Sequence, residues 1–384
     1  MMVARSVSFT LAILLTQVNS AKHHLFVSNL TPPSSLYALE FDDESLSLKI
    51  TANMTGDAPH SWITFNHDKT TIYGTSNNLP KISSYSVTSN HSLTPSNSIP
   101  ASGKCFNRTS AFAAASDVEP YRVVTGQWPG PDACGMSFDV LTNGTLDRVA
   151  DSWGYANKSG VHGLALGKAR GKGQLLYSAD LNGDAIWTHR IAEDGRAEVV
   201  GRLAVSNGSH PRHLAAHPGG ERLYAVMEAG NRVASFTLRE NGAVDGEEDS
   251  YSLIPSGKNT SNYWSAEVML SPDARYLWAT ARAQINTTIP GHISAFLVDD
   301  DGVIVKRMFR KETTTVGGIA NMVSPAPWSN EWVALTDIGT GYVQVWKMGQ
   351  KKEGRHGTEY GDAEALARVD IKDGGCCAVA IWYD

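Results

Sequence analysis

The sequence predicts an all-β fold, a seven-bladed β-propeller of four-stranded antiparallel blades. The first observation is a short hydrophobic strand pattern that recurs seven times, at intervals of 46 to 60 residues, around Leu36, Ile82, Cys134, Ile186, Val233, Ile293 and Val343. The second is a turn followed by a strand that carries an aromatic residue, which precedes several of these copies. A period near fifty residues that is built from strands is typical of propeller blades.

Each repeat supplies four strands: one before the turn, one after it, the recurring segment, and a more variable fourth strand. Apolar residues alternate along these strands, and Gly, Asn and Asp mark the turns between them. Residues 23–29 resemble a second strand, so the first blade begins without its innermost strand. The last residues, from Cys376, resemble that missing strand. We therefore expect the termini to pair in one blade and close the ring, which removes an exposed sheet edge.

The composition leaves room for one domain. The chain has 384 residues, of which 42% are hydrophobic, and seven blades of about fifty residues use nearly all of residues 21–384. A net charge of -6 without a basic run argues against nucleic acid or an anionic membrane as a partner. The sequence leaves the oligomeric state open.

Residues 1–20 have the pattern of a secretory signal peptide, with Arg5, an apolar run to Leu15 and small residues before Ala21. Triplets for N-glycosylation are about three times as frequent as chance would give, which supports the same route. The expected glycosylation sites are Asn29, Asn53, Asn90, Asn107, Asn143, Asn157, Asn207, Asn259 and Asn286. We therefore expect a secreted, extracellular glycoprotein.

The four cysteines match no zinc spacing, and they are compatible with disulfides in an oxidising compartment. Three complete pairings are open. The preferred bond joins Cys105 to Cys134 in the third blade, with Cys376 and Cys377 left as buried free thiols because adjacent cysteines bridge only in a strained ring. The segment from Asp180 begins like a calcium loop but has Ile191 at its twelfth position, so we expect no metal there.

The blade repeat also predicts where a functional site would lie. In antiparallel blades, the start of the first strand and the end of the second strand share one face of the ring. Alignment of the blades puts His162 and Arg212 at equivalent places just before first strands, and Glu228 and Arg282 four residues after the second-strand aromatics Tyr224 and Trp278. We expect all four to converge on one channel mouth. Second candidates for lining it, as substrate-binding residues, are His60, His213 and Glu267.

These residue types have a chemical logic as a group. Arginines bind carboxylates through two parallel hydrogen bonds, and a histidine and a glutamate can move a proton. A small anionic substrate, a carboxylate or a lactone, is therefore the expected ligand. Taken singly, each of these residues is better explained by a structural role, the hydrogen bonding of strand ends.

Several segments together resemble the fungal 3-carboxy-cis,cis-muconate lactonizing enzymes, or carboxy-cis,cis-muconate cyclases, within the seven-bladed lactonase family that includes 6-phosphogluconolactonase. They are GVHGLAL, HPRHLAAHP, YAVMEAGN, LWATARA, VSPAPWSNEWVALTD and the terminal AIWYD. The resemblance implies a metal-free cycloisomerisation without a cofactor, an isomerase reaction in which a muconate carboxylate adds to a double bond and a proton is delivered to carbon. His162, Arg212, Glu228 and Arg282 match the family's active-site residues, and either Glu228 or His162 would supply the proton.

Three functions remain open at this point. The first is the cycloisomerase, the second is a secreted lactonase that hydrolyses an anionic lactone at the same site, and the third is a secreted propeller that binds a small acid, a glycan or a protein without catalysis. Cyclisation of a muconate removes its diene absorbance, whereas lactone hydrolysis releases acid. Product chemistry therefore separates these functions.

Overall fold

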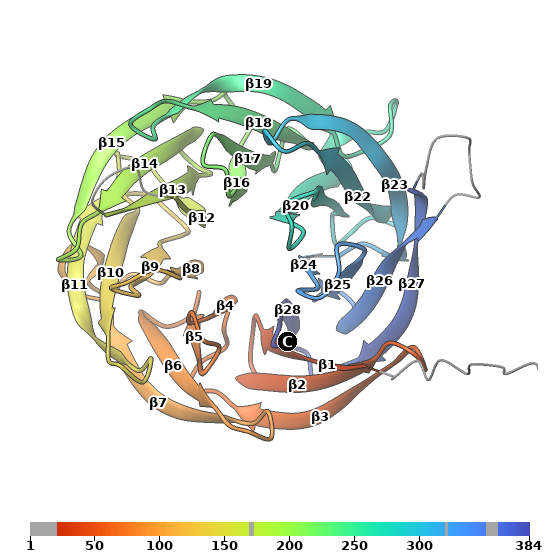
Figure 1. Cartoon of the computed structure of the whole chain (residues 1–384), viewed down its shortest axis with the longest axis horizontal. Helices are drawn as coiled ribbons and strands as arrows, with labels where there is room; N and C mark the ends of the chain where they lie inside the picture. Colours follow the sequence, from red (N-terminus) through yellow and green to blue (C-terminus); the bar gives the residue numbers. More distant parts are fainter. Residues whose placement is uncertain (1–20, 169–172, 319–321, 351–359) are drawn as a thin grey trace, which may run out of the picture.

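The computed structural model describes residues 21–168, 173–318, 322–350 and 360–384. In this part of the chain, seven antiparallel sheets of four strands are arranged in a ring (Figure 1). The predicted seven-bladed propeller is confirmed. The seven recurring segments that predicted it are the third strands of the seven blades.

The strands of each blade are ordered from the centre of the ring to its rim (Figure 1). The first strands are β28 (Cys376–Trp382), β4 (Trp62–Phe65), β8 (Phe112–Ala115), β12 (Val161–Gly167), β16 (Pro211–Ala216), β20 (Tyr263–Leu270) and β24 (Val323–Pro325). The second strands are β1 (Lys22–Asn29), β5 (Thr71–Thr75), β9 (Val123–Gly126), β13 (Gln174–Asp180), β17 (Arg222–Met227), β21 (Tyr276–Ala283) and β25 (Trp332–Asp337). The third strands are β2 (Ser35–Asp42), β6 (Lys81–Val87), β10 (Cys134–Val140), β14 (Ala185–Ile191), β18 (Arg232–Leu238), β22 (Pro290–Val298) and β26 (Tyr342–Gln350).

The outer strands and two helical turns complete the described elements. The fourth strands are β3 (Ser47–Thr55), β7 (Leu93–Pro100), β11 (Leu146–Gly154), β15 (Ala197–Ala204), β19 (Val244–Ser252), β23 (Ile304–Val316) and β27 (Tyr360–Asp370). Two short 3-10 turns, η1 (Gly103–Cys105) and η2 (Thr260–Asn262), lie in loops. Among the described residues, no helix is long and apolar enough to cross a membrane.

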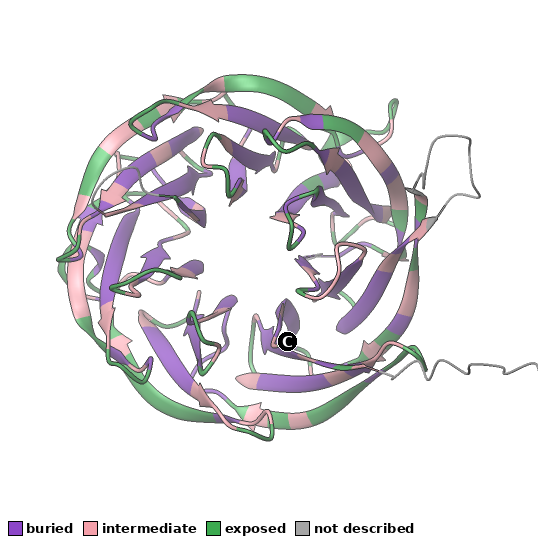
Figure 2. Cartoon of the chain, in the orientation of Figure 1, coloured by how far each residue is buried: buried purple, intermediate pink, exposed green. Residues whose placement is uncertain are grey.

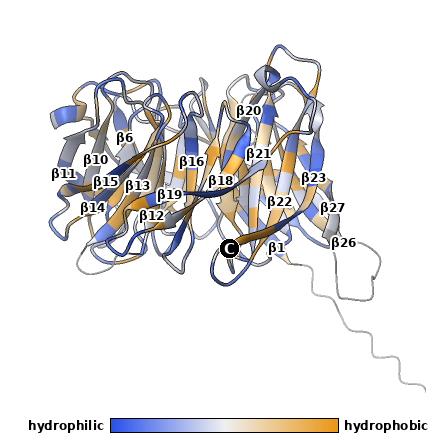
Figure 3. Cartoon of the chain, turned by 90° about the horizontal axis from the view of Figure 1, so that it is seen from above, coloured by the Kyte–Doolittle hydropathy of each residue, from blue (hydrophilic) through white to orange (hydrophobic). Residues whose placement is uncertain are grey.

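The core lies between the blades. Second and third strands are largely buried, whereas the fourth strands are mostly exposed or half-buried (Figure 2). Trp278 of β21 and Trp346 of β26 are among the largest fully buried side chains, and both belong to a cluster that joins the sixth blade to the seventh. Burying one such aromatic side chain stabilises the fold by about 2 to 3 kcal/mol. Seen across the ring, hydrophobic stretches of β21 and β22 run through the wall between two faces of loops (Figure 3).

Tyrosines of the second strands also connect neighbouring blades. The hydroxyl of Tyr73 donates to the carbonyl of Gly144, 2.6 Å away, in the turn between the third and fourth strands of the next blade. Tyr177 donates to Gly242 in the same way. Both glycines have a positive φ, which glycine adopts without steric cost. The second-strand aromatic noticed in the sequence therefore fixes one blade to the next.

The ring is closed as predicted, by strands from the two ends of the chain. The C-terminal strand β28 pairs antiparallel with β1, and Leu25 lies opposite Trp382. The indole nitrogen of Trp382 donates to the carbonyl of Ser324 in the seventh blade, 2.9 Å away. The first blade is thus assembled from both termini and bonded to its last neighbour.

The structure pairs all four cysteines. Cys105 and Cys134 form a disulfide within the third blade, at a Cα separation of 5.5 Å. The expectation that Cys376 and Cys377 are free is wrong, because their sulfurs are also bonded to each other. Both are buried, as expected, and the peptide bond between them is cis, with the Cα atoms 3.1 Å apart.

Candidate active site

A cavity of about 420 Å³ opens where the first strands begin and the second strands end. It is lined by Leu30, Ser61, Trp62, Asn77, Ala111, Trp128, His162, Arg212, His213, Glu228, Trp264, Arg282, Met322 and Ala378. The four residues placed at one mouth by blade alignment, His162, Arg212, Glu228 and Arg282, therefore share this cavity. They come from three neighbouring blades, the fourth to the sixth.

In six blades, a residue near the start of the first strand, or just before it, lines the cavity. These residues are Ala378, Ser61, Ala111, His162, Arg212 and Met322. At His162 and Arg212 the pairing register shifts, so that the strand carries one extra residue opposite its partner. Such a bulge redirects a side chain away from the regular alternation of the strand. The chain thus uses small residues on one side of the mouth and functional groups on the other.

Two arginines share one carboxylate in the cavity wall. Nε of Arg212 lies 3.0 Å from Oε2 of Glu228, and Nη2 of Arg282 donates to the same oxygen at 2.8 Å. Arg212 also donates to the carbonyl of Ala266, and the guanidinium of Arg282 lies 5.4 Å from the ring centre of Trp264. Both arginine side chains are less than a tenth exposed. Two cations and one anion leave this group with one excess positive charge.

Burial shapes the electrostatics of these arginines. Desolvation lowers the pKa of Arg212 and of Arg282, and in Arg282 the neighbouring Arg212 adds to the effect. Glu228 opposes the shift in both. An anion bound in the cavity would favour the charged guanidinium groups in the same way. The site is therefore suited to an anionic ligand.

A second chain of contacts runs from the cavity into the protein. Nδ1 of His162 lies 3.0 Å from Nε2 of His213, and Nδ1 of His213 lies 2.9 Å from Oε2 of Glu267. His213 packs edge-on against Trp62 and Phe112. The exposed fraction falls along the chain, from the half-buried His162 to 1% for His213 and 2% for Glu267.

The three groups have pKa values displaced by their surroundings. Burial lowers the pKa of His162 and of His213 well below the usual imidazole value, and Arg212 lowers both further. Burial raises the pKa of Glu267 to about 8, although Arg212 opposes the shift. In each case, desolvation disfavours the charged form. The His213 and Glu267 pair is thus held in its uncharged form at neutral pH.

Two of the second candidates do not line the cavity. His60 is 1% exposed; its Nε2 is bonded to the hydroxyl of Tyr85 at 2.7 Å. It lies one residue before Ser61, which lines the cavity, and the His60 ring instead contacts Tyr85 and the carbonyl of Thr75. Glu267 lies behind His213 and reaches the cavity only through that ring. Of the three residues, the structure places His213 alone in the wall.

Blade alignment did not single out the aromatic residues of the site. Trp128 follows β9 and lies 5.2 Å, between ring centres, from His162, and Trp264 lies at the start of β20 over Arg282. Their positions, just after a second strand and at the start of a first strand, are those at which the sequence predicted the site.

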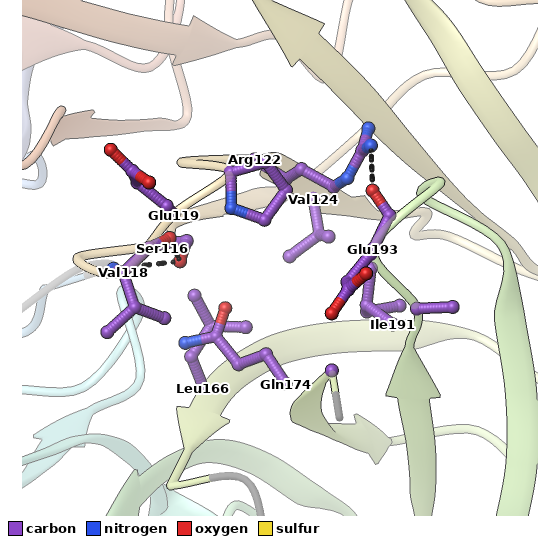
Figure 4. A pocket seen from close by; sticks show the side chains of 12 residues that line it. Ser116, Val118, Glu119, Arg122, Val124, Leu166, Gln174, Ile191 and Glu193 are labelled. Atoms are coloured by element: carbon purple, nitrogen blue, oxygen red, sulfur yellow. Dashed lines mark hydrogen bonds between the residues drawn. The ribbon is translucent and has the colours of Figure 1, made fainter. Parts of the chain in front are cut away.

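Another cavity, of about 320 Å³, lies between the third and fourth blades, at the opposite ends of the inner strands. Figure 4 shows Glu119, Glu193 and Gln174 around it, with Arg122 at its edge. Arg122 already pairs with Asp139 and donates to the carbonyl of Glu193. The guanidinium group of Arg122 is thus already bonded within the protein. In the described part of the chain, no group of three or more His, Cys, Asp or Glu residues is arranged to hold a metal ion.

The predicted glycosylation sites differ in accessibility. Asn29 is fully buried, and its amide donates to the carbonyl of Pro33 and to Asp373. The buried side chain of Asn29 leaves no room for a glycan, so we expect no glycosylation at this position. The other eight asparagines are exposed. The expected signal peptide lies outside the described residues.

Comparison with known proteins gives the family. Residues 24–317 match the family model described as "Lactonase, 7-bladed beta-propeller". The chain is 34% identical over 379 residues to the carboxy-cis,cis-muconate cyclase of Neurospora crassa, covering 94% of this chain and 99% of that protein. The chain therefore belongs to the seven-bladed β-propeller lactonase family.

Two further relatives agree with this assignment. The muconate cycloisomerase 1 of Cutaneotrichosporon cutaneum is 26% identical over 328 residues, covering 81% of this chain and 86% of that protein. The structure of the periplasmic gluconolactonase of Pseudomonas aeruginosa superposes with a TM-score of 0.76 at 18% identity, covering 94% of this chain and 99% of that one. The last comparison shows a shared fold.

Proposed function

We propose that the chain is an intramolecular lyase of the carboxy-cis,cis-muconate cyclase type, which converts a muconate-type polycarboxylate to its lactone. The observation that carries this proposal is the pair of buried arginines, Arg212 and Arg282, that share Glu228 at one cavity. Their excess positive charge suits a ligand with several carboxylates. The relative from Neurospora crassa that bears the cyclase name is 34% identical over 94% of this chain.

The proposed reaction is an isomerisation in which nothing is added or lost. One carboxylate oxygen of the substrate attacks a carbon of the conjugated diene, and a new C–O bond closes the ring. The displaced π electrons move toward the carbon next to another carboxylate, where an enolate-like charge develops. Arg212 and Arg282 would stabilise that charge, which is larger in the transition state than in the bound substrate. A proton delivered to the carbon completes the lactone.

His162 is the better proton donor of the two candidates. Glu228 accepts from the guanidinium group of Arg282 and lies within ion-pair distance of Arg212, so its contacts hold the two arginines in place. His162 lines the same cavity, and its Nδ1 is engaged by His213. Nε2 is then the ring nitrogen that can serve the substrate. We therefore assign the proton transfer to His162 and the positioning of both arginines to Glu228.

Lactone hydrolysis is the second candidate, because relatives named 6-phosphogluconolactonase match part of the chain, 27% identical over 142 residues in the protein from Sodalis glossinidius. The test incubates the purified chain with 3-carboxy-cis,cis-muconate, cis,cis-muconate, 6-phosphogluconolactone and gluconolactone. Loss of diene absorbance with appearance of a lactone supports the cyclase. Acid release from a lactone with no change in either muconate would replace it with a hydrolase. Binding without turnover would leave a non-catalytic propeller.

We also propose that the chain is secreted and N-glycosylated. The pattern of residues 1–20 supports this, as does the exposure of the eight acceptor asparagines other than Asn29. Expression in a eukaryotic secretory host, followed by peptide-N-glycosidase treatment, should lower the mass of the secreted protein. An Asn29→Gln variant should show the same mass shift as the unmodified chain. Absence of the protein from the medium would contradict the proposal.

A further inference from the structure

The proposed mechanism needs a proton at His162 but does not use the two groups behind it. His213 and Glu267 are buried polar side chains with no part in holding the substrate carboxylates. They lie in line with His162, at 3.0 Å and 2.9 Å, and extend away from the cavity. Glu267 is in turn fixed by the backbone N–H of Val268, which donates to its Oε1 at 3.0 Å.

A buried polar chain of this kind is costly unless every member has a partner. In this protein, neighbouring residues pack closely around His213, the middle member of the chain. Gly163 lies against His213 so closely that a Cβ atom at this position would come within 2.7 Å of Cδ2 of that ring. Trp62 of β4 and Phe112 of β8 cover the ring with apolar surface. Residues from three blades, the second to the fourth, therefore pack around His213 of the fifth blade and hold it between its two hydrogen-bonding neighbours.

We propose that Glu267, His213 and His162 form a proton relay that supplies the proton delivered to the substrate in the cavity. The inference rests on the proposed function for its substrate. At the start, Glu267 carries an O–H that faces Nδ1 of His213, and each imidazole carries its hydrogen on Nε2. Glu267 acts through His213 and is a positioning residue rather than a group that touches the substrate.

The relay step balances. The N–H bond at Nε2 of His162 breaks as the C–H bond of the product forms. The hydrogen on Nε2 of His213 moves to Nδ1 of His162, and the Glu267 O–H proton moves to Nδ1 of His213. Glu267 gains the negative charge that the substrate carboxylate loses on becoming a lactone. After product release, water in the cavity returns a proton along the same path.

The neighbouring charges are compatible with this role. Arg212 of β16, Arg282 of β21 and Glu228 after β17 face the chain from the cavity side, and the first two favour uncharged imidazoles. The raised pKa of Glu267 keeps a transferable proton on the carboxyl at neutral pH. Loss of this carboxyl proton as the pH rises should stop the relay. We therefore expect kcat to fall as the pH passes through about 8.

The test compares the full chain with Glu267→Gln, which keeps the shape and a hydrogen bond to His213 but has no proton to give. We expect kcat to fall at least tenfold with KM within twofold, and the alkaline limb of the kcat profile to disappear. The matched control, His189→Gln, removes another buried histidine that lies outside the site, and it should retain the wild-type profile. A Glu267→Gln enzyme with wild-type kcat and an unchanged alkaline limb would overturn the relay.

A second readout separates this inference from the proposed function. Nitrogen-15 NMR of histidine-labelled protein reports which ring nitrogen carries hydrogen, whether or not any substrate turns over. The relay predicts that His162 and His213 change tautomer together at one pH, and that Glu267→Gln abolishes the change. His162→Asn and His213→Asn assign the signals. Rings that titrate independently of each other and of Glu267 would overturn the relay, whereas a lack of turnover in the wild type would overturn only the proposed function.

Discussion

Gly163 of the fourth blade leaves the space that His213 of the fifth blade occupies. A Cβ atom at Gly163 would come within 2.4 Å of the carbonyl oxygen of Arg212 and 2.7 Å of Cδ2 of His213. The two residues bring β12 and β16 together at the point where both strands bulge toward the cavity. The hydrogen bond between His162 and His213 depends on this close approach.

Gly163→Ala should therefore damage both stability and activity. We expect a loss of about 1 to 3 kcal/mol of unfolding free energy, typical of overpacking, and at least a tenfold lower kcat. Gly154→Ala is the matched control, because a Cβ atom there meets nothing within 4 Å. Urea unfolding and steady-state kinetics measure the two effects. Wild-type kinetics in Gly163→Ala would show that the position of His213 is unimportant.

Glu228→Gln should leave two buried cations without their shared anion. Removing one partner of a buried charged group costs about 3 kcal/mol or more. Glu247→Gln removes the partner of Arg232 at the surface and should cost less than about 1 kcal/mol. Added formate should raise the Tm of Glu228→Gln more than that of the wild type, since the small anion can replace the carboxylate. Equal Tm shifts in both proteins would argue against an anion site at this position.

Acid should destabilise the fold through buried neutral histidines. Burial lowers the pKa of His60, His189 and His292 to about 4, whereas the ordinary value is 6.5. The unfolded chain therefore takes up protons first as the pH falls below 6.5, and stability is lost between about pH 6.5 and pH 4. Each histidine contributes up to about 1.4 kcal/mol per pH unit. Urea unfolding of His189→Gln should show a shallower pH dependence than the wild type, and parallel curves would contradict this.

Closure of the ring can be tested at Trp382. This side chain packs 4.7 Å, between ring centres, from Trp328 and bonds to Ser324, so it links the first blade to the seventh. Trp382→Ala should cost about 3 to 5 kcal/mol of unfolding free energy. Val199→Ala, at an exposed position in β15, should change it by less than about 0.5 kcal/mol. A Trp382→Ala protein as stable as this control would mean that the C-terminal strand contributes little.

The fold was predictable because its signal repeats. A weak strand pattern that recurs at Leu36 and six further places specifies the blades, and the same alignment brings Arg212 and Arg282 to one cavity. His60 fails for a specific reason, since the alignment was off by one residue and Ser61 holds the lining position. The bulge that turns His162 toward the cavity depends on strand register, which the sequence does not reveal.

Contacts between side chains of different blades were beyond the reach of the sequence. Nothing in the residues around Glu267 indicates that its carboxyl meets His213 rather than solvent. The bond between Cys376 and Cys377 is a similar case, because it depends on the local backbone conformation. In both cases, the missing information is three-dimensional geometry over a few ångströms.

The most direct measurement of the central claim is the decay of diene absorbance when the purified chain is mixed with 3-carboxy-cis,cis-muconate. We expect first-order decay to a lactone in the wild type. We also expect a loss of 100-fold or more in kcat/KM in Arg212→Lys, as is typical when a group that stabilises developing charge is removed (about 10² to 10³). Arg239→Lys, at an exposed ion pair on the rim, should be unaffected. Lactone formation that is equally fast in Arg212→Lys would contradict the assignment of this cavity as the site of the reaction.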